Sequence, residues 1–197
     1  MPLRVIAGDA RGVVLVQPPG AATRPTSARL REALFGMLEA AGADLDAVLD
    51  LYAGTGALGI EALSRGDGRC TFVEADARAA QAIRTNLDRT GLAARGVVAH
   101  APVGRWRPPS GVAYALVLAD PPYDDATAWG AIERTVAGAL APHAMLAVEH
   151  AARAPAPAQL AGLPLWRDRR HGDAAVAVYR APVADDPPVA ANEEGPA

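Results

Sequence analysis

The stretch LDLYAGTGALGIEAL, residues 49–63, decides how the rest of the chain is interpreted. Its glycines at positions 54, 56 and 59 have the G-x-G-x-x-G spacing of turns that bind nucleotide-type cofactors, with an apolar strand pattern before them and a helical pattern after them. Gly54 and Gly56 permit unusual dihedral angles and close approach of a ligand, whereas Gly59 lets the helix pack closely on the strand. The stretch therefore predicts a strand–turn–helix unit whose helix N-terminus faces a cofactor.

Strand and helix patterns alternate from this unit onward, which is typical of a parallel sheet joined by right-handed crossovers. The sequence predicts strands at 47–52, 69–76, 96–100, 113–120, 144–150, 165–169 and 174–179, and helices at 57–66, 77–90 and 127–140. The last two strands flank a turn, RHGD, and so predict a terminal antiparallel hairpin. The expected fold class is α/β, with a mostly parallel, Rossmann-like sheet that has helices on both faces.

The two ends of the chain have other patterns. Residues 3–17 contain two short apolar runs around GDARG, which predict a hairpin, and a helix is expected from about Ser27 to Gly42, capped by Thr26 or Ser27. We expect one domain over 1–180, made of an N-terminal hairpin extension (1–26) and a core (27–180). Residues 181–197 are acidic and proline-rich and are expected to form a disordered tail.

Composition excludes several classes of protein. The 197 residues contain no apolar run of membrane-spanning length, and the first residues lack a signal-peptide layout, so we expect a soluble cytoplasmic protein. The single cysteine, Cys70, lies in an apolar run and is expected to be buried, and the histidines lack metal-site spacing, so no metal is expected. The net charge is −3, but it becomes +1 without the acidic tail, and all 19 basic residues are arginine.

The residues around the glycines favour one cofactor over another. Glu74 ends the second strand, 20 residues after Gly54, where a carboxylate can accept hydrogen bonds from ribose hydroxyls of either NAD or S-adenosylmethionine. Asp50 is unfavourable beside an anionic pyrophosphate but favourable beside the sulfonium and ammonium of S-adenosylmethionine. The predicted cofactor-binding residues are Asp50, Tyr52, Gly54, Thr55, Gly56 and Glu74.

The sequence Asp120-Pro121-Pro122-Tyr123 follows an apolar strand, where ligands bind in open α/β sheets. The prolines stiffen the loop, so that a carboxylate, a carbonyl and an aromatic ring keep one arrangement. The Asp120 carboxylate and the Pro121 carbonyl can accept hydrogen bonds from the two N–H groups of an exocyclic amine and aim its lone pair at a methyl donor, while Tyr123 stacks on the base. These four residues are the predicted catalytic loop.

The chain resembles the amino-methyltransferases that use S-adenosylmethionine. Three segments carry this resemblance: VLDLYAGTGALGIEALSRG, TFVEAD and LADPPY. Over about residues 3–180, the chain more specifically resembles the RsmD-type bacterial 16S rRNA guanine-N2 methyltransferases. Three further segments carry this narrower resemblance: RVIAGDARGVVL, TRPTSARLREALF and RRHGDAAVAVYR. The resemblance implies the Rossmann-like methyltransferase fold, S-adenosylmethionine as the cofactor, and methylation of the N2 amino group of one guanine in 16S rRNA, on an assembling small subunit. One departure is His100-Ala101, which stands where many relatives have an acidic or amide residue facing the cofactor adenine.

An arginine-rich N-terminal segment is the expected contact for RNA. Within the first 35 residues arginines outnumber acidic residues, and an excess of arginine is suited to phosphate binding. The target guanine must leave its stack to reach Asp120. The predicted RNA-binding residues are Arg11, Arg24, Arg29 and Arg31, in a protein expected to act as a monomer.

Other functions remain open on the residues alone. A methyltransferase acting on adenine N6 in DNA, or on a protein glutamine, would use the same loop. An NAD-dependent oxidoreductase is disfavoured because the chain has no lysine for a Tyr-x-x-x-Lys pair. A non-catalytic RNA-binding module is disfavoured by the intact loop at Asp120–Tyr123.

Overall fold

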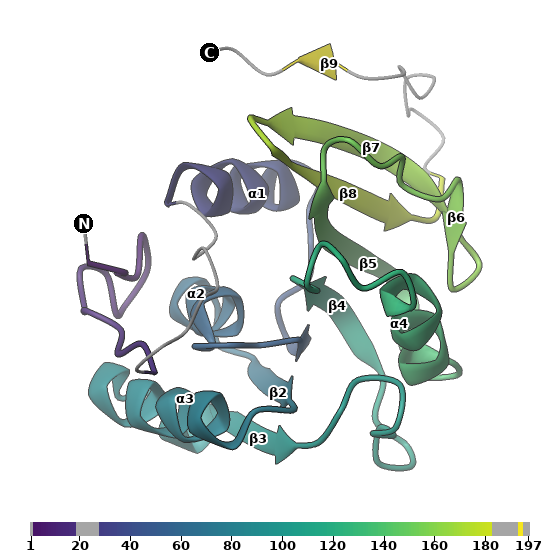
Figure 1. Cartoon of the computed structure of the whole chain (residues 1–197). Helices are drawn as coiled ribbons and strands as arrows, with labels where there is room; N and C mark the ends of the chain where they lie inside the picture. The colour runs from purple at the N-terminus through teal and green to yellow at the C-terminus, as the bar shows by residue number, and fades with distance from the viewer. Residues whose placement is uncertain (1, 19–27, 183–192, 195–197) are drawn as a thin grey trace.

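The fold is built on one twisted sheet, seen in the computed structural model, which describes residues 2–18, 28–182 and 193–194 (Figure 1). Five strands run parallel in the order β3-β2-β1-β4-β5. Their bounds are β1 Ala47–Leu51, β2 Arg69–Glu74, β3 Gly96–His100, β4 Tyr114–Ala119 and β5 Leu140–Ala151. All five were predicted, and the order places β2 and β4 on either side of β1. The polar residues that follow β1, β2 and β4 therefore meet at one edge of the sheet, as expected.

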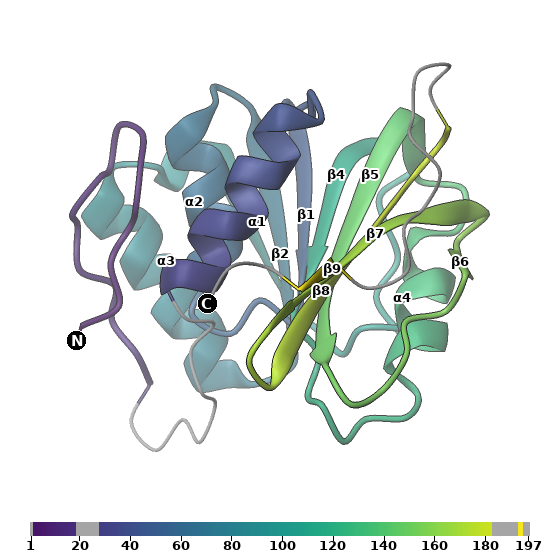
Figure 2. The same ribbon diagram turned by 90° about the horizontal axis from the view of Figure 1, so that it is seen from above.

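Helices cover both faces of the sheet, as predicted (Figure 2). Side chains of α1 (Ala28–Ala40), α2 (Ala57–Arg65) and α3 (Ala77–Thr90) form the core on one face, whereas α4 (Ala128–Val136) packs on the other. The helix α3 begins where the Asp76 side chain accepts hydrogen bonds from two backbone N–H groups, and it ends at Gly91 in a left-handed conformation. A short 3-10 turn, η1 (Ala93–Arg95), leads into β3.

The C-terminal part extends the sheet with antiparallel strands. The predicted hairpin is formed by β7 (Leu163–His171) and β8 (Ala174–Arg180), with β8 paired to β5 and the short strand β6 (Gln159–Leu160) added at the edge. The expectation of a wholly disordered tail is wrong at two residues, since β9 (Glu193–Glu194) pairs in parallel with β7. The rest of the predicted tail beyond residue 182 lies outside the described residues.

The N-terminal extension forms an irregular hairpin and not the regular β-hairpin that the sequence predicted. One bridge, between Arg4 and Val14, and backbone hydrogen bonds from Val5 to Val13 and from Leu15 to Leu3 hold its two arms together. Apolar side chains of this segment, Leu3, Val5 and Leu15, are buried with the α1–α3 side of the core. The proposed caps of α1, Thr26 and Ser27, lie outside the described residues.

Gly59 makes the close helix–sheet contact that its place in the glycine pattern predicted. A Cβ atom at this position would overlap the Phe72 ring and lie 2.7 Å from Cys70 Sγ and 2.9 Å from Asp50 Oδ2. All three neighbours belong to β1 or β2 and are almost completely buried, so they have little room to move.

We expect Gly59→Ala to lower the free energy of unfolding by about 3 kcal/mol, because overpacking a rigid core forces strain into it. Gly36→Ala is the matched control. Gly36 is exposed in α1, and a methyl group added there would have no atom within 4 Å, so alanine should raise stability by about 1 kcal/mol. Urea unfolding of both variants measures the difference, and equal stabilities would contradict the packing argument.

Candidate active site

The glycine turn after β1 has the unusual backbone dihedral angles that its glycines were predicted to permit. Gly54 and Gly56 have φ values of 56° and 78°, and Tyr52 also adopts a left-handed φ of 56°. This conformation is costly for a residue with a side chain and often marks a functional site. The turn is closed by a hydrogen bond of 2.7 Å from the Gly56 N–H to the Ala53 carbonyl and leads directly into α2.

Glu74 lies against this turn. Its Oε2 accepts a hydrogen bond of 2.7 Å from the Gly54 N–H, and its Oε1 accepts one of 2.8 Å from the Asp76 N–H. Each carboxylate oxygen has two lone pairs, so both can accept a further hydrogen bond from a ligand hydroxyl. The structure thus brings together the acid and the turn that were predicted to hold the cofactor from two sides.

Asp50 does not have the position that the sequence argument required. Its side chain is 1% exposed and lies beneath α2, where Oδ2 accepts a hydrogen bond of 2.9 Å from the Gly59 N–H. The carboxyl group therefore satisfies a backbone donor in the first turn of the helix. The prediction that Asp50 contacts the cofactor is wrong, because α2 and the strands enclose its carboxyl group.

The electrostatic surroundings of Asp50 also weaken its role as a fixed negative charge. Burial raises its pKa well above the usual value, the Gly59 hydrogen bond opposes this shift, and the nearby carboxylates of Asp120 and Glu74 raise the pKa further. Asp120 and Glu74 come from the ends of β4 and β2, the two strands that flank β1.

We expect Asp50→Asn to flatten the dependence of stability on pH. Because the folded-state pKa of Asp50 is raised, the folded protein keeps a proton that the unfolded chain releases near pH 4, so stability falls as pH rises from about 4 toward the raised pKa. Asparagine keeps an acceptor for the Gly59 N–H and cannot ionise. Urea unfolding at pH 5 and pH 8 should show a smaller loss in the variant than in the wild type; an equal loss would contradict this assignment.

The loop Asp120–Tyr123 follows β4 directly, at the same edge of the sheet as the glycine turn. Its Asp120 N–H is 3.4 Å from the Leu51 carbonyl of β1, Pro121 is buried, and Pro122 and Tyr123 are exposed. The Tyr123 hydroxyl donates a hydrogen bond of 2.7 Å to Oε1 of Glu149 on β5. Sequence reasoning missed Glu149, because AVEH reads as the end of an ordinary buried strand.

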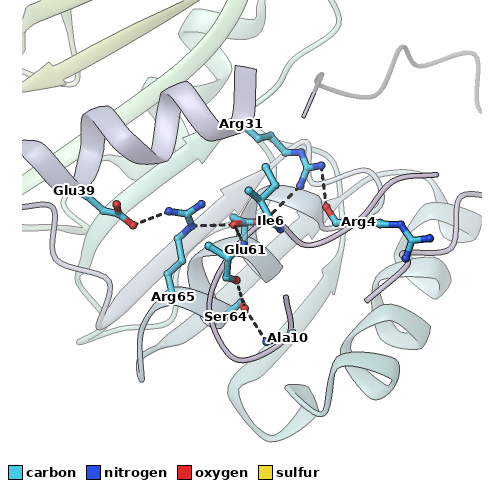
Figure 3. A network of polar contacts seen from close by, with 9 residues as sticks. Arg4, Ile6, Ala10, Arg31, Glu39, Glu61, Ser64 and Arg65 are labelled. Atoms are coloured by element: carbon cyan, nitrogen blue, oxygen red, sulfur yellow. Dashed lines mark hydrogen bonds and ion pairs between the residues drawn. The ribbon is translucent and has the colours of Figure 1, made fainter. Parts of the chain in front are cut away.

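The N-terminal extension is fixed to α2 by a buried polar network (Figure 3). Glu61 accepts hydrogen bonds of 2.8 Å and 3.0 Å from the N–H groups of Ile6 and Ala7, and one of 2.9 Å from Arg65 Nε. Arg31 of α1 lies 3.6 Å from Glu61 and donates a hydrogen bond to the Arg4 carbonyl. These contacts connect the extension to the helix that begins at the glycine turn.

The prediction that Arg31 binds RNA is therefore wrong. The residue is 1% exposed, and its guanidinium is enclosed between the extension and α2. Its place in the arginine-rich segment suggested a surface residue, but the helical spacing of Leu30, Leu34 and Leu38 turns this side of α1 inward. Arg11 and Arg29 are exposed, and Arg24 lies outside the described residues.

Asn86 of α3 is a second residue that sequence reasoning did not identify. Its fully buried carboxamide accepts a hydrogen bond of 2.7 Å from the Val16 N–H and donates to the carbonyls of Val16 and Thr55 at 3.0 Å and 2.9 Å. The Asn86 side chain thus joins the N-terminal extension to the glycine turn. No local pattern marks it, since a helical asparagine is usually read as a solvent-facing residue.

The histidine at position 100, the single cysteine and the possible metal ligands are the last residues to place. His100 is exposed, pairs with Glu74 in the sheet register and has its Nε2 3.0 Å from the Ala75 carbonyl. Cys70 is buried in β2, as predicted. Within the described residues, no group of three potential ligands could hold a metal ion, and no helix is long and apolar enough to cross a membrane.

Sequence comparison identifies the family. A family model described as Conserved hypothetical protein 95 matches residues 3–180. The chain is 33% identical over 183 residues to ribosomal RNA small subunit methyltransferase D of Escherichia coli strain K12, covering 90% of this chain and 89% of that protein. The chain belongs to the family that this model describes, Conserved hypothetical protein 95. A shorter match to YlbH of Bacillus subtilis strain 168, 45% identical over 87 residues, covers 43% of this chain and 46% of that protein.

Solved structures agree with this family assignment. The yhhF protein of Escherichia coli has a TM-score of 0.75 and 31% identity, over 92% of this chain and 98% of that one. An RNA methyltransferase from Salinibacter ruber, solved with S-adenosyl-L-homocysteine, has a TM-score of 0.58 over 82% of this chain and 97% of that one; at 19% identity it shows the fold alone. The resemblance to RsmD-type enzymes, the Rossmann-like methyltransferase fold and the methyltransferase class are thus confirmed.

Proposed function

We propose that this protein transfers a methyl group from S-adenosylmethionine to the exocyclic N2 amino group of a guanine in small-subunit rRNA. The observation that carries the proposal is the convergence of two predicted sites at adjacent strand ends. The glycine turn and Glu74 follow β1 and β2, and Asp120–Tyr123 follows β4, which pairs with β1 through Leu51 and Ala119. A cofactor on the turn and a base on the loop would be neighbours.

The residues at the turn fit S-adenosylmethionine, which supplies an electrophilic methyl group when bound. Gly54 and Gly56 hold a left-handed backbone that lets a ligand approach closely, and Tyr52 and Thr55 lie in the same turn. Glu74 offers carboxylate lone pairs where a ribose diol is expected. Glu74 would suit the ribose of a dinucleotide equally well, so the choice of S-adenosylmethionine is supported by the methyltransferase family to which the chain belongs.

The catalytic loop would activate the amine by position. The Asp120 carboxylate and the Pro121 carbonyl accept hydrogen bonds from its two N–H groups, so that the nitrogen lone pair faces the methyl group, and Tyr123 stacks on the base. Alignment of this kind is worth several kcal/mol. The proton becomes acidic once the nitrogen is methylated, so Asp120 can accept it without being a strong base.

The RNA substrate is supported by the family and by exposed arginines in the first 35 residues. The relative from Escherichia coli that covers most of this chain is named for small-subunit rRNA. Arg11 and Arg29 are exposed and are proposed phosphate contacts, together with Arg24. We further propose that the protein acts in the cytoplasm as a monomer without a metal, and that its substrate is an assembling small subunit.

The proposal is tested by incubating the full chain with methyl-labelled S-adenosylmethionine and small-subunit rRNA that lacks the modification, free and in particles. Label should enter the RNA, and calorimetry should show binding of S-adenosylhomocysteine and none of NAD. Label in DNA or in protein alone, or binding of NAD alone, would overturn the proposal.

A further inference from the structure

Glu149 stands beside the proposed catalytic aspartate. The register of the parallel strands pairs Ala119 of β4 with Val148 of β5. The next residues along the two strands are Asp120 and Glu149, so their backbones lie about 5 Å apart, the spacing of neighbouring strands. Two acidic residues are therefore neighbours at the carboxyl ends of β4 and β5, where the base is proposed to bind.

The loop itself returns to this second carboxylate. Tyr123 donates its hydroxyl hydrogen bond to Glu149 Oε1 at 2.7 Å, so the last residue of the tetrapeptide that begins at Asp120 contacts Glu149. Glu149 is 8% exposed and Tyr123 is 38% exposed. The bond holds both the tyrosine ring and the carboxylate in one orientation, and a carboxylate can accept several hydrogen bonds at once.

A carboxylate at this place can distinguish one purine from another. In guanine, the atom beside the C2 amino group is N1, which carries a hydrogen and donates. In adenine, the N1 beside the C6 amino group is a bare acceptor, which a carboxylate repels. A site that hydrogen-bonds a substrate N–H strongly rejects an analogue that lacks it, because the buried acceptor loses its partner.

We propose that Glu149 is a specificity-determining residue that accepts the N1–H hydrogen bond of the target guanine, while Asp120 and the Pro121 carbonyl hold its N2 amino group. Tyr123 has two roles in this arrangement: its ring stacks on the base and its hydroxyl orients Glu149. This inference rests on the proposed function, since it presupposes that the protein methylates guanine N2.

The test uses 2-aminopurine, which keeps the 2-amino group but has an acceptor at N1. The full chain is assayed on rRNA that carries either guanine or 2-aminopurine at the modified position. The wild type should prefer guanine by about 100-fold or more in kcat/KM. Glu149→Gln can still accept the Tyr123 hydrogen bond and can donate to an N1 acceptor, so its preference should fall below about 10-fold. A preference unchanged from the wild type, including equal losses on both RNAs, would overturn the inference.

Two further variants keep this result interpretable. Glu133→Gln changes an exposed acid on α4 in the same way and should leave the preference unaltered. Tyr123→Phe keeps the ring and removes the hydroxyl, so it should lower the preference in the same direction, and it decides the question if Glu149→Gln does not fold. A wild type that methylates no guanine would refute the proposed function itself, whereas guanine methylation with an unchanged preference would refute only the role of Glu149.

Discussion

Asp120→Ala is expected to slow methyl transfer about 1,000-fold while leaving the affinity for S-adenosylhomocysteine within about twofold of the wild type. The carboxylate is proposed to orient the amine of the base, and the cofactor is expected to contact the glycine turn and Glu74. Single-turnover methylation measures the rate, and calorimetry measures the cofactor affinity.

Asp124→Ala is the matched control for this variant. Asp124 directly follows the loop, its side chain is 94% exposed, and its ion-pair partner Arg153 is 74% exposed. Such pairs contribute little to stability, so the control should keep both its rate and its fold. If Asp120→Ala retained the wild-type rate, the proposed role of Asp120 would be wrong.

Glu61→Leu is expected to lower the free energy of unfolding by about 4 kcal/mol, the largest effect on stability that we predict. The change leaves the N–H groups of Ile6 and Ala7 without their acceptor and removes the charge opposite buried Arg31. Breaking a buried ion pair at one partner is costly because the other charge stays uncompensated. Urea unfolding of the full chain gives the value.

Glu39→Leu provides the comparison within the same network. Glu39 pairs with Arg65 at 2.6 Å, but its side chain is 56% exposed, so its loss should cost less than about 1 kcal/mol. Similar losses for the two variants would mean that the extension is not fixed to α2 through Glu61.

Periodicity predicted the central strands of the sheet well because β1 and β4 are buried on both faces and bounded by turn residues. The strand at 96–100 was predicted with the bounds of β3, and the glycines at 54, 56 and 59 have the conformations or contacts that their spacing implied. The irregular N-terminal hairpin was not predictable in detail, because its arms are held by side chains of α1 and α2 and only partly by one another.

Burial explains the errors at the site. Asp50 and Arg31 are charged residues, which are usually expected at the surface or beside a ligand, but each is enclosed with a partner on α2. Glu149 and Asn86 were missed for the opposite reason. Their roles depend on Tyr123 and on Val16 and Thr55, and only the folded chain brings these residues together.

The central claim is methylation of guanine N2, and its most direct test is the nucleoside composition of the modified RNA. Small-subunit rRNA methylated by this protein is digested to nucleosides and separated by liquid chromatography with mass spectrometry against standards. The account predicts one new species, N2-methylguanosine, which forms about 1,000-fold more slowly in reactions with Asp120→Ala. A new N6-methyladenosine, or a methylated guanine whose methyl group is not on N2, would contradict it.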